Sequence, residues 1–217
     1  MSIITQRITD ALFVIQVGCA LLFGVTQVTR MLTTTEGVSL TWFLFWALFL
    51  FINLRLAIRA HQVYPTRLSR QTIITYVAWS TVLAGAIGVL LWRSLGQWAA
   101  VDTLNMWVSG AGIALVLAVG RLRGLGIADP LVRGWLAVFF KGTPQLTLAW
   151  HILQNGGEGL APFAILSGHI TINLRIGQLV FALREAGWDR NRLGSALSEV
   201  ANELSWVVTT VAWFAVR

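Results

Sequence analysis

The chain has few charged residues for its length. Of its 217 residues, 16 are Lys or Arg and 9 are Asp or Glu, which makes 12% charged. A soluble domain carries about a quarter of its residues as charges. The shortage is concentrated in long stretches almost free of charge. These facts exclude a soluble enzyme and a disordered chain, and they argue against nucleic-acid binding despite the net charge of +7.

Motifs of catalysis and of metal binding are also missing. Cys19 is the only cysteine, so no intramolecular disulfide and no cysteine-based metal cluster can form. The three histidines, His61, His151 and His169, lie far apart without the spacing of metal ligands. No Gly-rich phosphate loop, nucleophile elbow or HExxH motif occurs. We therefore expect no enzyme activity, no cofactor and no metal site.

Long apolar segments take up most of the chain. A transmembrane helix needs about 20 mostly apolar residues. Seven segments meet this need, roughly 11–30, 39–60, 72–93, 102–120, 131–153, 160–183 and 197–216. The first has no small-residue cleavage site after it, which favours a retained helix over a signal peptide. The sequence thus predicts an all-α integral membrane protein, placed in the plasma (inner) membrane and in contact with lipid.

The two halves of the chain share an ordered series of matches. Ile52-Asn53-Leu54-Arg55 recurs as Ile172-Asn173-Leu174-Arg175, and Gly24-Val25-Thr26-Gln27 corresponds to Gly142-Thr143-Pro144-Gln145. Further pairs in the same order are Glu36-Gly37 with Glu158-Gly159, Arg67-Leu68 with Arg192-Leu193, and Trp79 with Trp206. Matches in this order indicate a duplicated unit of three helices.

The number of helices then predicts the topology. Three helices leave the chain on the opposite side of the membrane, so two parallel copies need one extra helix between them. The segment 102–120 matches neither copy and supplies this return. We therefore predict a first repeat over 1–97, a linker helix over 98–124 and a second repeat over 125–217, with a solute site between the halves.

These residues also resemble a known family. Gln27-x-x-Arg30, Thr35-Glu36-Gly37-Val38-Ser39-Leu40, Trp46 and Asn53 are similar to the PQ-loop pattern, as are Pro144-Gln145, Glu158-Gly159-Leu160-Ala161-Pro162 and Asn173. This superfamily contains the SWEET sugar transporters, lysosomal amino-acid exporters such as cystinosin, and the KDEL receptor. The resemblance implies a seven-helix carrier with alternating access. The first copy departs from it with Thr26-Gln27 in place of Pro-Gln.

The motif residues have two interpretations each. Pro144 removes a backbone hydrogen bond within its helix and predicts a bend there, either a hinge or a static kink. Gln27 and Gln145 need partners inside the membrane, as gate contacts or as bonds between helices. Asn53 and Asn173 occupy matching places, so both should face the central axis or neither should. They either bind solute or hold their own three helices together.

A second group of candidates lies in the third and last helices. Asn202 and Trp206 correspond to Thr75 and Trp79, and the four side chains could line a solute pocket. Sugar carriers of the resembled family place an asparagine in each of these two helices, whereas Thr75 stands at one of the positions here. The alternative for both tryptophans is anchoring at the lipid interface, where Trp is enriched.

Few charges lie within the apolar segments. Glu203 is a candidate proton-coupling site, because several members of the resembled family work through an acid of this type; an ion pair with a neighbouring arginine is the alternative. Lys141, Arg55 and Arg175 are the other intramembrane charges. The two arginines can extend to the membrane surface.

The basic residues also predict an orientation. The N-terminal tail and the loops on its side contain Arg7, Arg59, Arg67, Arg70, Arg121, Arg123, Arg133, Arg184, Arg190 and Arg192, whereas the opposite side contains Arg30, Arg93 and Arg217. The positive-inside rule places the N-terminus in the cytoplasm. The resemblance implies the opposite orientation.

The sequence therefore favours a secondary carrier for a small polar solute, sugar or amino-acid-like, with proton coupling as an option. The alternative is a non-transporting receptor or assembly factor on the same fold. A receptor needs a pocket closed on one side with a strongly charged lining, and a carrier needs access from each side in turn. The solute itself, and homo-oligomerisation, stay open.

Overall fold

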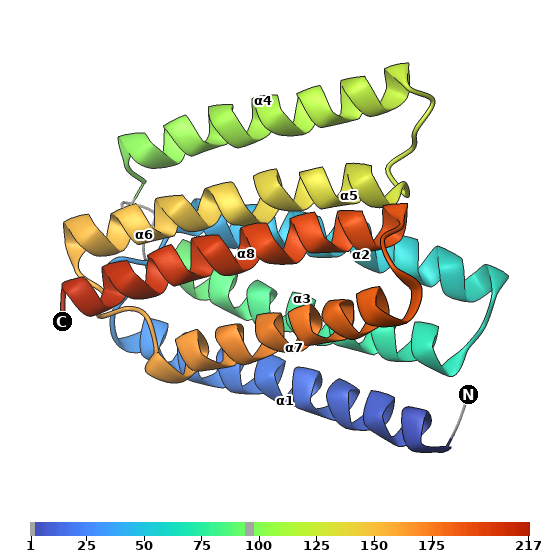
Figure 1. Cartoon of the computed structure of the whole chain (residues 1–217). Helices are drawn as coiled ribbons and strands as arrows, with labels where there is room; N and C mark the ends of the chain where they lie inside the picture. Colours follow the sequence, from blue (N-terminus) through green and yellow to red (C-terminus); the bar gives the residue numbers. More distant parts are fainter. Residues whose placement is uncertain (1–2, 94–97) are drawn as a thin grey trace.

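The computed structural model describes residues 3–93 and 98–217, which are helical with no strand. The helices are α1 (Ile3–Thr33), α2 (Leu40–Val63), α3 (Arg67–Arg93), α4 (Ala100–Leu122), α5 (Pro130–Ala137), α6 (Thr143–Asn155), α7 (Pro162–Ala186) and α8 (Arg190–Ala215), with a π-helical turn η1 (Val138–Gly142) between α5 and α6. Because α5, η1 and α6 form one continuous rod, the described chain contains seven rods (Figure 1). The prediction of seven helices is confirmed, and the boundary predicted after residue 97 lies outside the described residues.

Side-chain caps mark several helix ends. The Ser39 hydroxyl accepts a hydrogen bond from the Trp42 amide at the start of α2. Asp129 accepts bonds from the Leu131 and Val132 amides at the start of α5, ahead of a proline at the first position. Such caps satisfy amides that have no partner within the helix. Arg190 of α8 bonds to Asp129 at 2.8 Å and holds the pKa of this carboxyl below its usual value.

Four of the rods are long and apolar enough to cross a membrane by length and composition alone: residues Arg7–Thr33 of α1, and α2, α3 and α4 in full. The sequence predicted seven such segments, and the other three rods fall short of this length or hydropathy for a physical reason. The helices α7 and α8 include charged side chains, among them Arg175, Glu199 and Glu203, and η1 divides the remaining rod into shorter pieces. The four apolar helices are compatible with a membrane protein.

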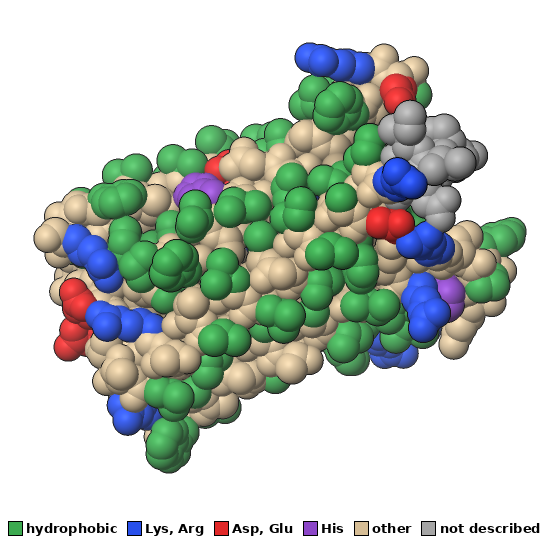
Figure 2. Space-filling model, turned by 90° about the horizontal axis from the view of Figure 1, so that it is seen from below, with side chains coloured by type: hydrophobic (Ala, Val, Ile, Leu, Met, Phe, Trp, Pro, Cys, Tyr) green, Lys and Arg blue, Asp and Glu red, His purple; other side chains and the backbone are tan. Residues whose placement is uncertain are grey.

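The surface agrees with an apolar surrounding. Large hydrophobic side chains are exposed along the rods, for example Leu115, Phe181 and Phe214. Figure 2 shows hydrophobic side chains over the middle of one face, with most Lys, Arg, Asp and Glu near its two ends. A soluble monomer rarely exposes so much contiguous apolar surface.

The rods alternate in direction along the chain. In Figure 1, α1, α3, the α5–α6 rod and α8 run one way, α2, α4 and α7 run back, and the two termini lie at opposite ends of the bundle. The helix α3 packs against both α1 and α2, and α8 packs against α5, α6 and α7. Between these groups, α1 packs on α7 and α2 packs on η1 and α6. The helix α4 lies mainly against the α5–α6 rod.

Two glycines allow α5 and α8 to touch. A Cβ on Gly194 would lie 2.1 Å from the carbonyl oxygen of Pro130, and a Cβ on Gly134 would lie 2.6 Å from the carbonyl oxygen of Gly194. Small residues at such contacts are typical of helix pairs in membranes. The second group of helices is therefore closely packed at the end of the bundle that carries the N-terminus.

The π-helical turn stands directly before Pro144. A proline ring clashes with the carbonyl four residues earlier, here that of Phe140, and lacks the N–H that would bond to it. The amide of Thr143 bonds to the carbonyl of Val138, five residues back, which widens the helix by one residue. Such widening relieves the clash and marks a local irregularity in the rod.

Candidate functional site

A cavity of about 550 Å³ lies between the two groups of helices. Its lining comes from α1, α2, α3, the α5–α6 rod, α7 and α8, and the described residues of α4 lie outside it. Along α8 it extends from Asn191 to Trp206, and along α1 from Thr9 to Phe23. The cavity thus runs from the end of the bundle with the N-terminus past its middle, a size and depth suited to a small solute.

Aromatic rings form the inner end of the cavity. Trp42 and Trp206 stack with ring centroids 5.7 Å apart, and Trp46 lies 5.2 Å from Trp79. Phe23 contacts Trp79 edge-on at 5.4 Å. All five line the cavity. A ligand that reaches this end would meet flat apolar faces rather than polar groups.

Several polar atoms in the walls lack partners. Trp79 Nε1, Arg133 Nε, Glu199 Oε2 and Asn202 Oδ1 are buried and form no hydrogen bond to any described residue. All four residues belong to the cavity lining. An unsatisfied buried polar group costs about 1–3 kcal/mol, so these atoms would gain from a ligand or water that offers two donors and two acceptors.

Charged side chains lie along the same walls. Arg175 Nη1 is 3.7 Å from Glu199 Oε1, and Arg133 Nη2 donates to Asn53 Oδ1 at 2.8 Å. Lys141, in the η1 turn, is buried. The bond between Asn53 and Arg133 joins α2 to α5 and therefore connects the two groups of helices across the cavity.

The opposite end of the bundle is closed by contacts between the two groups. Gln27 is fully buried; its Nε2 donates to the carbonyl of Gly159 at 2.8 Å, and its Oε1 accepts from the amide of Ala161 at 3.1 Å. The amide of Gly159 donates to the carbonyl of Glu36 at 2.9 Å. Arg30 forms an ion pair with Glu158. The loops at residues 34–39 and 156–161 are thereby held together.

The two glutamines occupy different surroundings. Gln27 joins the two groups of helices, whereas Gln145 bonds within its own group. The Ser205 hydroxyl donates to Gln145 Oε1, and the Thr209 hydroxyl lies 3.2 Å from the carbonyl of Gln145. Gln145 also lines the cavity, and Gln27 and Pro144 do not.

The two repeated asparagines are not equivalent in space. Asn53 is buried and lines the cavity, whereas Asn173 is exposed and outside it. The repeat predicts one shared environment for both, and this prediction is wrong. On α7 the inward positions include Thr171 and Arg175, so the letters that match in the two helices point in different directions.

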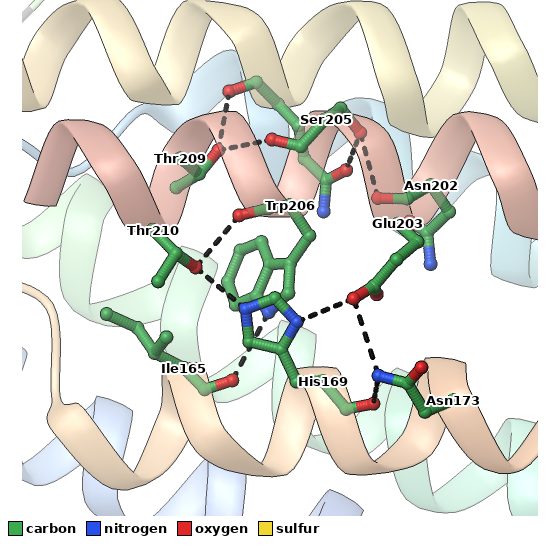
Figure 3. A network of polar contacts seen from close by, with 10 residues as sticks. Ile165, His169, Asn173, Asn202, Glu203, Ser205, Trp206, Thr209 and Thr210 are labelled. Atoms are coloured by element: carbon green, nitrogen blue, oxygen red, sulfur yellow. Dashed lines mark hydrogen bonds and ion pairs between the residues drawn. The ribbon is translucent and has the colours of Figure 1, made fainter.

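Of the other predicted pocket residues, Asn202, Trp206, Thr75 and Trp79 surround the cavity together. Thr75 Oγ1 bonds to the carbonyl of Gln71 in its own helix. Trp206 Nε1 donates to the carbonyl of Ile165 at 3.2 Å, as Figure 3 shows. Trp79 Nε1 is thus the free indole donor of the pair. The two tryptophans are buried, which excludes a role as lipid-interface anchors.

Glu203 lies between α7 and α8, outside the cavity lining (Figure 3). Its Oε1 is 2.8 Å from His169 Nδ1 and 3.4 Å from Asn173 Nδ2. The other ring nitrogen of His169 lies 2.9 Å from the Thr210 hydroxyl. The partner of Glu203 is therefore a histidine, whereas the sequence suggested an arginine, and the nearby ion pair with Arg175 belongs to Glu199.

A buried network at the closed end was missed by the sequence analysis. Asp102 of α4 accepts hydrogen bonds from the hydroxyls of Ser39 and Thr41 and lies 2.6 Å from His151 Nε2. Asp102 and His151 are almost inaccessible to solvent. The network connects α2, α4 and α6. His151 was interpreted as a packed or interfacial histidine because no sequence spacing connects it with Asp102.

Metal binding finds no support in the described part of the chain, where no group of three or more His, Cys, Asp or Glu residues could hold an ion. No family model, no curated protein and no solved structure matches this chain.

Proposed function

We propose that this protein is a secondary carrier that moves a small polar solute, sugar or amino-acid-like, across a membrane by alternating access. One observation carries the proposal: a cavity with unpartnered polar atoms lies between two helix groups and ends at contacts that join those groups. The proposal includes seven membrane crossings, two parallel repeats joined by α4, and membership of the PQ-loop superfamily.

The cavity lining supports the repeat. The same interval along the chain separates Thr72, Thr75 and Trp79 of α3 from Glu199, Asn202 and Trp206 of α8, and all six line the cavity. The packing supports it as well, because the first helix of each group contacts the second helix of the other. This reciprocity is expected of two copies related by a twofold axis along the membrane normal.

Alternating access requires that one end open as the other closes. At the closed end, Gln27 and the Arg30–Glu158 pair join the two groups of helices. On the opposite side of the cavity the groups are joined by the bond between Asn53 and Arg133. The η1 turn before Pro144 lies between these levels, and we assign it the role of hinge in the second group.

The orientation follows from charge. The open end is the end of the bundle at which α1 begins, and ten of the arginines lie in or near the parts of the helices toward this end. The positive-inside rule places this end in the cytoplasm, so the structure corresponds to a carrier open to the cytoplasm.

Uptake or counterflow in proteoliposomes, screened over sugars, amino acids and organic acids, tests the function. We expect solute movement that saturates with concentration. A purified and folded protein that moves none of these solutes from either side would contradict the carrier proposal.

Asn202→Leu should reduce uptake about 5- to 30-fold, because it removes an unpartnered acceptor from the cavity wall, where one hydrogen bond contributes about 1–2 kcal/mol. Gln62→Leu is the matched control, since Gln62 is exposed near the end of α2 and does not line the cavity. Initial rates in the same proteoliposomes measure both. Equal losses in the two variants would contradict a binding role for Asn202.

Glu203→Gln should abolish any dependence of uptake on a pH gradient while leaving counterflow intact, because the proton site would then be permanently neutral. His169 faces Glu203 from α7, and the neighbouring pair of Arg175 and Glu199 lies nearer the cavity. Glu199→Gln is the comparison, and we expect it to weaken solute binding. Persistent gradient dependence in Glu203→Gln would exclude Glu203 as the proton site.

A receptor is the second candidate, and the charged lining favours it. The cavity is open at one end in this structure and contains Lys141, Arg175 and Glu199. A receptor would bind its ligand without moving it across the membrane. Binding to the purified protein combined with absent counterflow of the same ligand would favour this alternative.

A further inference from the structure

The cavity lining has an excess of positive charge. Its charged residues are Arg133, Lys141, Arg175, Arg192 and Glu199. Two of the cations have a counter-ion, because Arg175 lies 3.7 Å from Glu199 and Arg192 lies 2.8 Å from Asp189. Arg133 and Lys141 form no ion pair with a described residue, and Glu199, the carboxylate that acts electrostatically on Lys141, is already paired with Arg175. The lining therefore holds two positive charges that no described acidic residue neutralises.

Lys141 is the more unusual of the two cations. It is the only lysine of the chain and only 6% of it is exposed. Its ammonium lies 5.7 Å from the centre of the Phe49 ring, and it donates no hydrogen bond to the described part of the protein. Such a group normally has a counter-ion, because moving an unpaired cation out of water costs several kcal/mol.

Arg133 lies about two turns earlier on the same rod. One of its terminal nitrogens donates to Asn53, and its Nε is buried without a partner. An arginine with a free Nε can donate two parallel bonds to one carboxylate or phosphate. The rod α5–η1–α6 therefore presents two cations with unused donors to one cavity.

We infer that the cavity binds a small organic anion through a carboxylate held by Lys141 and Arg133. The inference rests on the proposed function, in which this cavity is the solute site, and it names the solute class. A neutral sugar would leave both cations uncompensated in a low-dielectric site. A carboxylate provides acceptors for both cations, together with the missing charge.

The rest of the cavity fits the body of such a solute. Glu199 Oε2 and Asn202 Oδ1 are buried acceptors without donors, and a hydroxyl or amino group on the solute would satisfy them. The aromatic inner end accepts an apolar portion, and Trp79 Nε1 offers one further donor. The complementary ligand is a carboxylate with a short polar or apolar chain.

The single lysine makes a direct test feasible. Acetylation by an amine-reactive ester, followed by mass spectrometry of the peptide that contains Lys141, reports the accessibility of this one side chain in the intact protein. Succinate and L-glutamate should slow the acetylation at least tenfold at saturation, and glucose, which has no carboxylate, should not. Equal protection by glucose, equal protection by chloride or phosphate, or no protection by either organic acid would overturn the inference.

Variants then test the two cations. Quenching of tryptophan fluorescence measures the affinity for succinate and can be applied to a variant that lacks Lys141. Lys141→Met and Arg133→Gln should each weaken binding at least tenfold, because each removes a charge-assisted hydrogen bond. Arg184→Gln is the matched control, since Arg184 is exposed and does not line the cavity. Wild-type affinity in both cavity variants would overturn the inference. If either variant fails to fold, the acetylation assay on the unsubstituted protein is the deciding test.

The outcomes separate this inference from the proposed function. Binding of succinate without counterflow would support the anion site and favour a receptor over a carrier. Counterflow of a neutral sugar without protection of Lys141 by either acid would leave the carrier standing and remove the anion site.

Discussion

Asp102→Asn should lower the free energy of unfolding by about 3 kcal/mol, since it leaves buried donors without their acceptor, at about 1–3 kcal/mol for each group. The carboxylate accepts bonds from the Thr41 hydroxyl at 2.6 Å, from the Ala99 amide at 3.0 Å and from His151 Nε2 at 2.6 Å. An asparagine amide would replace one of the two acceptor oxygens by an NH2 group, which faces these donors with a further donor. The helix α4 has few other polar contacts with the rest of the bundle, so its attachment should weaken first.

Thermal unfolding in detergent, followed by circular dichroism, measures this effect. Glu185→Gln is the control, because Glu185 is exposed at the end of α7 and its replacement should change the unfolding temperature little. A double variant with His151→Ala should lose less than the sum of the single changes, since both act on one network. Unfolding of Asp102→Asn at the wild-type temperature would contradict the account.

Gln27→Leu should open the closed end of the bundle. It leaves the Gly159 carbonyl and the Ala161 amide buried without their partner, at about 1–3 kcal/mol for each group. These contacts exist only where the two helix groups meet, so their loss penalises the closed arrangement and not the open one. A penalty of about 3 kcal/mol shifts the ratio of the two states by about a hundredfold.

Cysteine labelling measures the shift. With Cys19 replaced by Ala and Thr75 by Cys, a membrane-impermeant maleimide added on the closed side should react at least tenfold faster in Gln27→Leu. Thr26→Val is the control, because Thr26 is half-buried and its hydroxyl bonds to the carbonyl of Leu22 in its own helix. Equal labelling rates in the two variants would show that Gln27 does not hold this end closed.

Hydropathy alone predicted the number of helices and their places along the chain. Each predicted segment coincides with one of the rods and extends at most two residues beyond it, because the length of an apolar run is a local property. Pro144 likewise predicted an irregular helix by its own chemistry, and the π-helical turn stands beside it. The prediction of membrane-spanning segments was less accurate where charges interrupt the apolar runs, as in α7 and α8.

Identical residues in the two repeats did not predict that their side chains face the same way. The shared Ile-Asn-Leu-Arg motif placed Asn53 and Asn173 together, but the inward counterpart of Asn53 on α7 is Arg175, two residues further along. A helix advances 100° per residue, so a shift of two residues turns a side chain from the cavity to the outside. Sequence identity over four letters carries no information about such a rotation.

Residues with a partner in another helix were hardest to foresee. Arg133 was counted only as a charge at the membrane surface, and it bonds to Asn53 across the cavity. His151 was set aside as isolated, and it lies beside Asp102, 49 positions away. In both cases the partner stands in a different helix, so no spacing within one segment could reveal the pair.

The sequence by itself determined that this chain forms seven helices, because helix length and hydropathy depend on neighbours along the chain. It predicted seven membrane spans, whereas four of the helices in the structure are long and apolar enough to cross a membrane. It also determined that one lysine stands among fifteen arginines. Only the tertiary structure decided that this lysine enters a cavity, that Asn173 does not, and that Gln27 joins the two helix groups. Those outcomes depend on the rotation and packing of whole helices, which contacts between distant segments establish.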